Sequence, residues 1–186
     1  MRVIAGTARS LPLKAPEGMD TRPTTDRIKE TLFNMLQPVL PGAVFVDLFS
    51  GSGAIGIEAL SRGAKKAYFV ENGFKAFDCI RQNLAFTKLS DRAIVIKQEA
   101  SLAVRGIQEV EVDIVFMDPP YNCSHEQRVL GVLKELDWVT VETLVIVEAA
   151  LDTDFSWAQE MGFCVEREKR YKTNKHVFLR RMVGTP

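Results

Sequence analysis

The fold of this chain is decided by the stretch Val44-Phe45-Val46-Asp47-Leu48-Phe49-Ser50-Gly51-Ser52-Gly53-Ala54-Ile55-Gly56. Its first half is apolar apart from one aspartate, as expected of a strand buried on both faces of a parallel sheet. Its second half has the spacing Gly51-x-Gly53-x-x-Gly56, which is typical of a turn from a strand into a helix where the backbone approaches a nucleotide-type ligand. We therefore predict a strand over residues 44–49 and a helix over residues 53–62.

Strands and helices continue to alternate on the C-terminal side of this unit. The pattern predicts strands at residues 66–71, 93–96, 112–117 and 143–148, and helices at about residues 75–88, 101–110, 126–136 and 155–161. Two final strands, at residues 163–170 and 175–181, are joined by a short turn and should therefore be antiparallel. The expected class is α/β, with a seven-stranded Rossmann-like sheet, helices on both faces and a terminal antiparallel hairpin.

The N-terminal side of the stretch is expected to add a small extension. Residues 3–6 and 11–14 are short extended pieces around a glycine-containing turn, which predicts a β-hairpin. Thr24 or Thr25 is a good N-cap for an amphipathic helix that ends before Pro38. We predict a basic hairpin extension over residues 1–23 and one domain over residues 24–186.

Composition limits the class of protein. The 186 residues are 46% hydrophobic and 26% charged, as in an ordinary globular domain. No apolar run approaches the roughly 20 residues needed to cross a bilayer, and no signal peptide is recognised at the start, so a cytoplasmic protein is expected. The three cysteines and two histidines have no ligand spacing, and no metal site is predicted.

Charge is distributed unevenly although the net charge is zero. Residues 1–30 contain six Lys or Arg against four Asp or Glu, and residues 165–186 contain seven against two. Basic ends around an acidic middle fit a protein that holds an anionic polymer between its termini. Solvated basic tails are the alternative interpretation.

A second motif, Asp118-Pro119-Pro120-Tyr121, follows the strand predicted at residues 112–117. Proline fixes φ and has no N–H, so the carbonyl groups of Asp118 and Pro119 are held without a competing donor. Acceptors beside an aromatic ring can hold a flat group that carries an amine, such as a nucleobase. Because ligands of open α/β sheets bind at the carboxyl ends of the strands near the switch point, we expect this motif and the glycine turn to share one crevice. A plain turn after a strand is the alternative.

The glycine turn predicts a nucleoside-type cofactor. Glu71 lies twenty residues after Gly51, at the end of the next strand, where an acidic residue binds ribose hydroxyls. Asp47 would face a cationic or neutral ligand better than a diphosphate, which favours S-adenosylmethionine over NAD. Glu99 is placed to accept a hydrogen bond from the adenine amine, or else it is a carboxylate at a helix start. The candidate cofactor-binding residues are Asp47, Phe49, Ser50, Gly51, Ser52, Gly53, Glu71, Asn72, Glu99 and Ala100.

Together the two motifs resemble those of class I S-adenosylmethionine-dependent methyltransferases that act on exocyclic amines of nucleobases. The start of the chain, with Arg2-Val3-Ile4-Ala5-Gly6 and Thr21-Arg22-Pro23-Thr24-x-Asp26-Arg27-x-Lys29-Glu30-x-Leu32-Phe33-Asn34, is similar to the RsmD family of bacterial 16S ribosomal RNA guanine-N2 methyltransferases. The resemblance covers nearly the full length. Ser10 departs from it where the family often has glycine, and Glu99 where aspartate is common.

The resemblance implies methylation of the N2 amine of a guanine in 16S rRNA, within small-subunit ribosomal particles. It implies that Asp118, Pro119, Pro120 and Tyr121 are catalytic, with the amine hydrogens bonded to the Asp118 carboxylate and the Pro119 carbonyl and the base stacked on Tyr121. The expected RNA contacts are Arg2, Arg9, Lys14, Arg22, Arg27, Lys169, Arg170, Lys172 and Lys175. A DNA adenine-N6 or cytosine-N4 methyltransferase, an NAD-type oxidoreductase and a non-catalytic RNA-binding factor remain alternatives.

Overall fold

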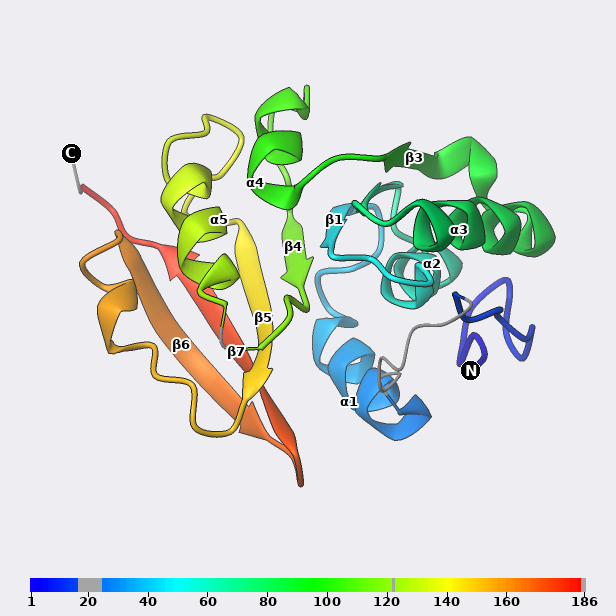
Figure 1. Cartoon of the computed structure of the whole chain (residues 1–186), viewed down its shortest axis with the longest axis horizontal. Helices are drawn as coiled ribbons and strands as arrows, with labels where there is room; N and C mark the ends of the chain where they lie inside the picture. Colours follow the sequence, from blue (N-terminus) through cyan, green and yellow to red (C-terminus); the bar gives the residue numbers. More distant parts are fainter. Residues whose placement is uncertain (17–24, 122, 185–186) are drawn as a thin grey trace.

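The chain forms one sheet of seven strands in the order β3-β2-β1-β4-β5-β7-β6 (Figure 1). The structure is a computed structural model that describes residues 1–16, 25–121 and 123–184. Neighbours from β3 to β5 are parallel, whereas β7 pairs antiparallel with both β5 and β6. The strands are β1 Val44–Leu48, β2 Lys66–Val70, β3 Ala93–Ile96, β4 Ile114–Met117, β5 Leu144–Ala150, β6 Phe163–Arg170 and β7 Asn174–Arg181. The predicted α/β class and the terminal hairpin are confirmed.

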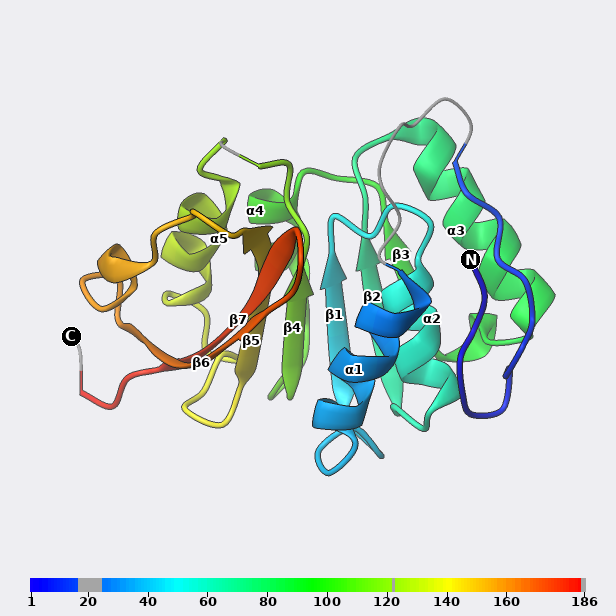
Figure 2. The same ribbon diagram turned by 90° about the horizontal axis from the view of Figure 1, so that it is seen from below.

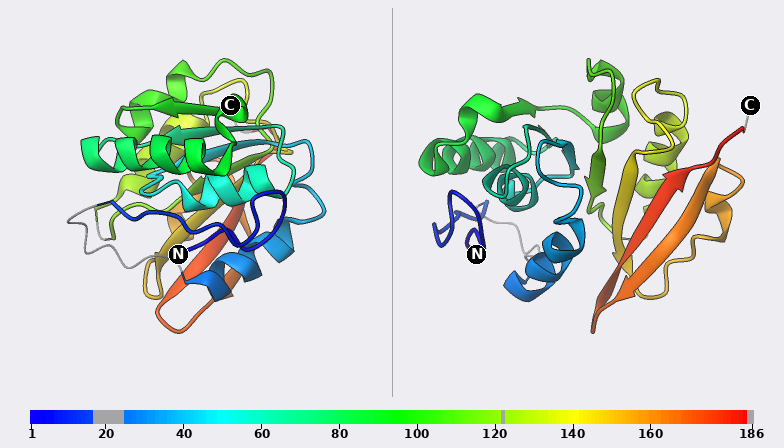
Figure 3. Two further views of the ribbon diagram at one scale, coloured as in Figure 1. Left: turned by 90° about the vertical axis from the view of Figure 1, so that its right-hand side faces the viewer. Right: turned by 180° about the vertical axis from the view of Figure 1, so that it is seen from behind.

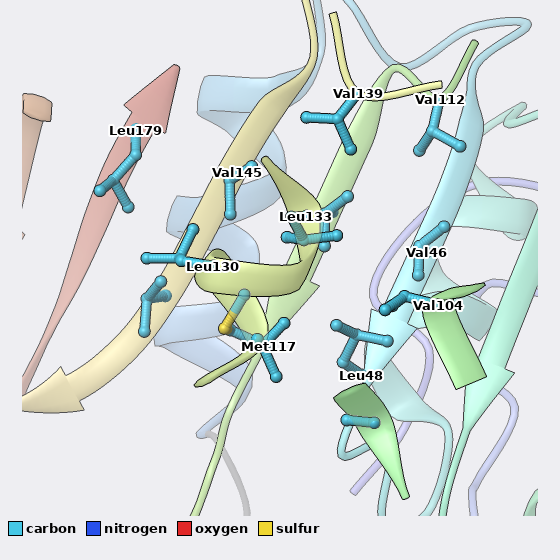
Figure 4. Packing of buried hydrophobic residues seen from close by; sticks show 14 of the residues in the cluster. Val46, Leu48, Val104, Val112, Met117, Leu130, Leu133, Val139, Val145 and Leu179 are labelled. Carbon is cyan, nitrogen blue, oxygen red and sulfur yellow. The ribbon is translucent and has the colours of Figure 1, made fainter. Parts of the chain in front are cut away.

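Helices cover both faces of the sheet (Figure 2). They are α1 Asp26–Leu36, α2 Ala54–Ser61, α3 Phe74–Thr87, α4 Ala100–Ala103 and α5 His125–Leu133, with short 3-10 turns η1 Ser90–Arg92, η2 Val104–Gly106 and η3 Ser156–Ala158. Apolar residues of α1, α2 and α3 pack on one face, and those of α4 and α5 pack on the other. Figure 4 shows the second cluster, in which Leu130 and Leu133 of α5 lie over Met117 and Val145. Burial of both faces explains why the central strands are continuously apolar.

Two predicted helices are shorter than expected. The helix expected at residues 101–110 is α4 followed by η2, and it ends at Gly106. Glycine is a poor helix former, so the helix ends readily at Gly106. Val104 and Ile107, before and after Gly106, are both buried, and the chain leads from there to β4. The helix expected at residues 155–161 is reduced to η3.

The two pieces of the predicted N-terminal β-hairpin do pair antiparallel, but they form one bridge rather than two strands. An isolated antiparallel bridge joins Arg2 and Pro12, and around it the Val3 N–H donates to the Leu11 carbonyl at 3.0 Å. Pro12 has no N–H to extend this pairing into a ladder. Ser10 has a φ of +68°, a left-handed conformation that glycine adopts more readily than serine.

The first sixteen residues pack against α2 and α3 rather than standing apart (Figure 3). The buried Glu58 carboxylate of α2 accepts hydrogen bonds from the backbone N–H groups of Ile4 at 2.8 Å and Ala5 at 3.0 Å. The same carboxylate forms ion pairs with Lys29 of α1, at 3.4 Å, and with Arg62, at 2.8 Å. Glu58 therefore ties the N-terminal segment, α1 and α2 together.

Close packing and a side-chain clamp hold the same segment at two more points. A Cβ at Gly6 would lie 1.8 Å from the Ser61 carbonyl oxygen, so only glycine fits there. Asn83 of α3 accepts from the Lys14 N–H at 2.9 Å and donates to the Lys14 carbonyl at 3.0 Å. The boundary predicted after residue 23 falls in residues 17–24, outside the described residues, and stays a prediction.

Thr25 caps α1, since its hydroxyl accepts a hydrogen bond from the Ile28 N–H. Thr24, the other predicted cap, lies outside the described residues.

Among the helices of the described ranges, none is both long enough and apolar enough to cross a membrane.

Candidate active site

A cavity of about 660 Å³ opens at the carboxyl ends of β1, β4 and β5. The loop after β1 and the loop after β4 form two of its walls, and α1 and the N-terminal segment contribute to a third. It is lined by Met1, Ala15, Pro16, Lys29, Asp47, Phe49, Ser50, Gly51, Ser52, Ala54, Ile55, Glu71, Phe116, Asp118, Pro119, Pro120, Tyr121 and Glu148. The structure thus brings the predicted glycine turn and the predicted Asp-Pro-Pro-Tyr motif into one crevice.

Hydrogen bonds fix the glycine turn. The Ser50 hydroxyl donates to the Asp47 carbonyl at 2.6 Å, and the Gly51 N–H donates to Glu71 Oε2 at 2.9 Å. Glu71 Oε1 accepts from the Gly73 N–H at 2.7 Å, so its carboxylate is held at the end of β2. A Cβ at Gly51 would meet nothing within 4 Å, which shows that this side of the turn is open to the cavity.

Phe49 begins the turn in a strained backbone conformation. Its φ is +59°, in the left-handed region that side chains other than glycine rarely adopt. The ring contacts His125 of α5, with 5.7 Å between ring centroids. Strain of this kind persists where surrounding contacts enforce it, and it is common at ligand-binding loops.

Asp47 is a buried carboxylate in the cavity wall, only 1% exposed. Its Oδ2 atom accepts from the Gly56 N–H at 3.0 Å. Burial raises the pKa of Asp47 to about 7 against the opposing effect of that hydrogen bond, and the charge of Glu71 raises it further. A positively charged ligand group near Asp47 would stabilise its ionised form, whereas a diphosphate would be repelled.

The other two glycines serve packing. Gly53 has a φ of +78° at the start of α2, and a Cβ there would lie 3.3 Å from Ile80. A Cβ at Gly56 would lie 2.3 Å from the Phe69 ring of β2. Gly53, a predicted cofactor residue, therefore does not line the cavity but allows α2 to approach the sheet.

Asp118 stands at the end of β4 and faces the cavity opposite the glycine turn. Burial, followed by the negative charges of Glu148 and Asp47, raises the pKa of Asp118 well above that of an ordinary aspartate. Pro119 is buried, while Pro120 and Tyr121 are exposed. The Tyr121 ring thus lies at the rim of the cavity, where a flat group can stack on it.

Besides Gly53, three predicted cofactor residues lie outside the cavity lining: Asn72, Glu99 and Ala100. Glu99 caps α4, with its Oε2 accepting from the Ser101 hydroxyl at 2.5 Å and from the Leu102 N–H at 3.2 Å. Burial raises the pKa of Glu99, but these hydrogen bonds outweigh it and the pKa is lowered. The other oxygen, Oε1, is buried without a hydrogen-bond partner among the described residues, which leaves an acceptor for a donor group such as an amine.

Among the charged and aromatic residues that line the cavity, sequence reasoning missed Lys29, Phe116 and Glu148. Glu148 is 6% exposed and its carboxylate accepts from Asn174 Nδ2 at 2.5 Å and lies 3.1 Å from His176 Nε2. A signal was present, because Glu148 is the first charged residue after the apolar run of β5 and falls at the carboxyl end of the strand. Lys29 of α1 is buried, and burial lowers its pKa against the effect of Glu58.

Most of the predicted RNA-contacting side chains are accessible. Arg9, Arg27 and Lys172 are exposed, and Lys169 is half-buried. Arg2 pairs with Asp26 at 3.1 Å, Lys14 donates to Gln82, and Arg170 lies 3.6 Å from Glu168. Arg22 lies outside the described residues.

Lys175 departs from the expectation that it contacts RNA. The residue is only 4% exposed, and its ammonium group pairs with Glu168 at 2.9 Å and lies 5.5 Å from the centroid of the Phe155 ring. Pairing of β7 with both β5 and β6 places it inside the sheet, which local charge composition did not reveal. It is therefore not available to a phosphate group.

Arg167, which was not among the predicted RNA contacts, is an exposed basic residue of the same hairpin. Residues directly opposite in antiparallel strands lie on the same face, and the register places Lys169 opposite His176, which is in turn opposite Glu148. Arg167 is exposed and lies opposite Phe178 in the neighbouring row. Arg167 and Lys169 therefore extend from the edge strand on the face of the sheet that carries Glu148.

A doubly wound sheet whose glycine turn after β1 and Asp-Pro-Pro-Tyr motif after β4 face one cavity is the architecture of a methyltransferase. Comparison with known proteins narrows the class. The chain belongs to the RsmD-type methyltransferase family, whose model, described as "Conserved hypothetical protein 95", matches residues 1–180.

Similar proteins of known name support this assignment. "Ribosomal RNA small subunit methyltransferase D" of Escherichia coli K12 is 37% identical over 153 residues, which cover 82% of this chain and 76% of that protein. The protein of the same name from Haemophilus influenzae is 38% identical over 156 residues, covering 82% and 80%. A solved structure of yhhF from Escherichia coli superposes with a TM-score of 0.83 at 33% identity and covers 99% of each chain.

Proposed function

We propose that this protein transfers a methyl group from S-adenosylmethionine to the N2 amine of a guanine in 16S rRNA of the small ribosomal subunit. The observation that carries the proposal is the single cavity in which the Gly51 turn, Asp47 and Glu71 face Asp118 and Tyr121. Relatives named rRNA small subunit methyltransferases support ribosomal RNA as the substrate.

The residues of the cavity fit S-adenosylmethionine. The turn around Gly51 would allow its sugar to approach the backbone, and Glu71 would accept from the ribose hydroxyls because each carboxylate oxygen can accept two hydrogen bonds. Asp47 favours the positively charged end. Glu99 lies outside the cavity lining, and its Oε1 atom, which has no hydrogen-bond partner among the described residues, is the acceptor that we propose for the adenine amine. When bound, the cofactor supplies a methyl group on a positively charged sulfur that departs as a neutral thioether.

Asp118 prepares the amine for attack. The N2 lone pair of guanine is delocalised into the ring, so the amine is a poor nucleophile. Hydrogen bonds from its two hydrogens to the Asp118 carboxylate and the Pro119 carbonyl favour a tetrahedral nitrogen and stabilise the positive charge that develops on it. The proton released after transfer passes to the Asp118 carboxylate or to water. Tyr121 holds the plane of the base, which supplies orientation.

Basic side chains on two flanks support RNA binding. In Figures 1 and 3, α1 lies between the N-terminal segment, which carries Arg2 and Arg9, and the β6–β7 hairpin, which carries Arg167 and Lys169. Phosphate groups bound on both flanks would draw the strand across the cavity mouth. The target base must leave its stack to reach Asp118.

Transfer of a radiolabelled methyl group tests this function. The protein is incubated with labelled cofactor and either naked 16S RNA, assembled 30S particles or DNA, and the labelled nucleoside is identified by chromatography and mass spectrometry. We expect N2-methylguanosine from one or both ribosomal substrates and no product from DNA. Methyladenine or methylcytosine in DNA, or no transfer to any of the three, would overturn the proposal.

A further inference from the structure

A second carboxylate lies beside Asp118 in the cavity. Glu148 follows the apolar run of residues 144–147 in β5. The side chains of Glu148 and Asp118 both line the cavity. Burying a carboxylate is costly unless it is paired, and Glu148 is paired on the side of β5 that faces away from β4 and Asp118, by two residues of β7. The mechanism above needs only Asp118 and the Pro119 carbonyl to hold the amine, and leaves Glu148 without a role.

The position of Glu148 is fixed from behind. Asn174 and His176, both on β7, contact its two carboxylate oxygens at 2.5 Å and 3.1 Å. His176 is completely buried, with the Tyr171 hydroxyl 3.2 Å from its Nδ1 and the Phe116 ring packed edge-on at 5.9 Å. The carboxylate is therefore held in one orientation by these two contacts, and an ionised carboxylate has about four acceptor sites in all.

The three nucleobases with exocyclic amines differ beside that amine. In guanine the neighbouring ring nitrogen, N1, carries a hydrogen and is a donor. In adenine and in cytosine the neighbouring ring nitrogen carries a lone pair and is an acceptor. Two adjacent carboxylates therefore match the N1–H and N2–H donors of guanine, whereas a carboxylate placed against the lone pair of adenine or cytosine is repelled.

We propose that Glu148 accepts a hydrogen bond from the N1–H of the target base while Asp118 holds the neighbouring amine, so that Glu148 is the residue that selects guanine. This inference rests on the proposed guanine-N2 function. A site with a buried polar group rejects an analogue that leaves the group unpaired, and one base contact of this kind gives about 10- to 100-fold discrimination.

The test replaces the target guanine by 2-aminopurine, which keeps the 2-amine but has a lone pair at N1. Once the methylated nucleotide has been located, RNA with either base at that position is assembled by ligation and kcat/KM is measured for wild type and Glu148→Gln. Wild type should methylate 2-aminopurine about 10- to 100-fold less efficiently than guanine. Glu148→Gln should reduce this ratio at least several-fold, because the glutamine amide can donate to N1. Loss of the guanine O6 atom affects both proteins equally.

Equal rates of wild type on guanine and 2-aminopurine would overturn the inference, and this result needs no variant to fold. An unchanged ratio in a folded Glu148→Gln protein would overturn it as well. Glu166→Gln on the exposed edge strand is the matched control and should keep both rates. Failure of wild type to methylate guanine at all would contradict the proposed function rather than the role of Glu148. Binding of S-adenosylhomocysteine and the melting temperature establish that each variant is folded.

Discussion

The buried carboxylate of Asp47 lowers the free energy of unfolding but favours binding of a positively charged ligand group. Its pKa is raised by burial from its ordinary value to about 7. The folded state therefore binds more protons than the unfolded state between about pH 4 and pH 7, and Asp47 lowers the free energy of unfolding as pH rises through that window. The protein accepts this cost where a positively charged ligand group would offset it.

Asp47→Asn should relieve the cost. Asparagine keeps an oxygen for the Gly56 N–H but has no charge to bury, so we expect the free energy of unfolding at pH 8 to rise by on the order of 1 kcal/mol. Urea denaturation of both proteins at pH 5 and pH 8 measures the difference, and binding of S-adenosylhomocysteine should weaken in parallel. A larger stability gain at pH 5 than at pH 8 would contradict this explanation.

Asp118 should set the pH dependence of methyl transfer. Its pKa is raised, and its carboxylate must be ionised to accept hydrogen bonds from the amine, so single-turnover rates should rise with pH through a midpoint above that of an ordinary aspartate. Glu148 contributes to the shift, so Glu148→Gln should move the midpoint to lower pH. A midpoint that stays in place or moves upward would show that Asp118 does not control the profile.

At the scale of elements, Glu58 joins the N-terminal segment to α1 and α2. Glu58→Gln leaves Lys29 without its buried counter-charge, and breaking a buried pair in this way typically costs about 3–5 kcal/mol. The exposed pair between Arg105 and Glu135 provides the control, because Glu135→Gln should cost less than about 1 kcal/mol. Urea unfolding curves compare the two, and equal costs would refute the role given to Glu58.

The face of the β6–β7 hairpin that carries Arg167 and Lys169 should contribute to RNA affinity. Arg167→Ala should weaken binding of 16S RNA and reduce the slope of log affinity against log salt by about one, the change expected when one phosphate contact is lost. Arg105 lies in η2, on the other face of the sheet from Arg167, and Arg105→Ala should leave the slope unchanged. Filter binding between low and moderate salt measures both, and identical slopes for wild type and Arg167→Ala would exclude this face.

At the scale of the whole molecule, local patterns predicted the elements that depend on local physics. Apolar runs and the Gly51–Gly56 turn predicted the strands, the class of fold and the shared crevice, because burial and turn geometry are properties of short segments. Gly106 was visible in the sequence, but whether it ended the helix depended on the core around Val104 and Ile107.

Pairing between strands that are distant in the sequence determined which charged residues are buried, and the sequence did not reveal this. Lys175 and Arg167 are both basic residues of the terminal hairpin, yet the β7 register buries the first and leaves the second exposed. Glu148 became a site residue only because β5 lies between β4 and β7, which brings it beside Asp118 and in front of His176. The motif at residues 118–121 predicts an amine as the target group, whereas the residues around the motif follow only from the order of the strands in the sheet.

The most direct test of the account measures two properties of one variant, Asp118→Asn. Asparagine keeps the size of the side chain but is a weaker acceptor and carries no charge to stabilise the developing cation. We predict that methyl transfer to the ribosomal substrate falls at least about 100-fold, as is typical when a group that stabilises the transition state is removed, while calorimetry finds S-adenosylhomocysteine bound as tightly as in wild type or more tightly. Wild-type turnover by Asp118→Asn would contradict the account.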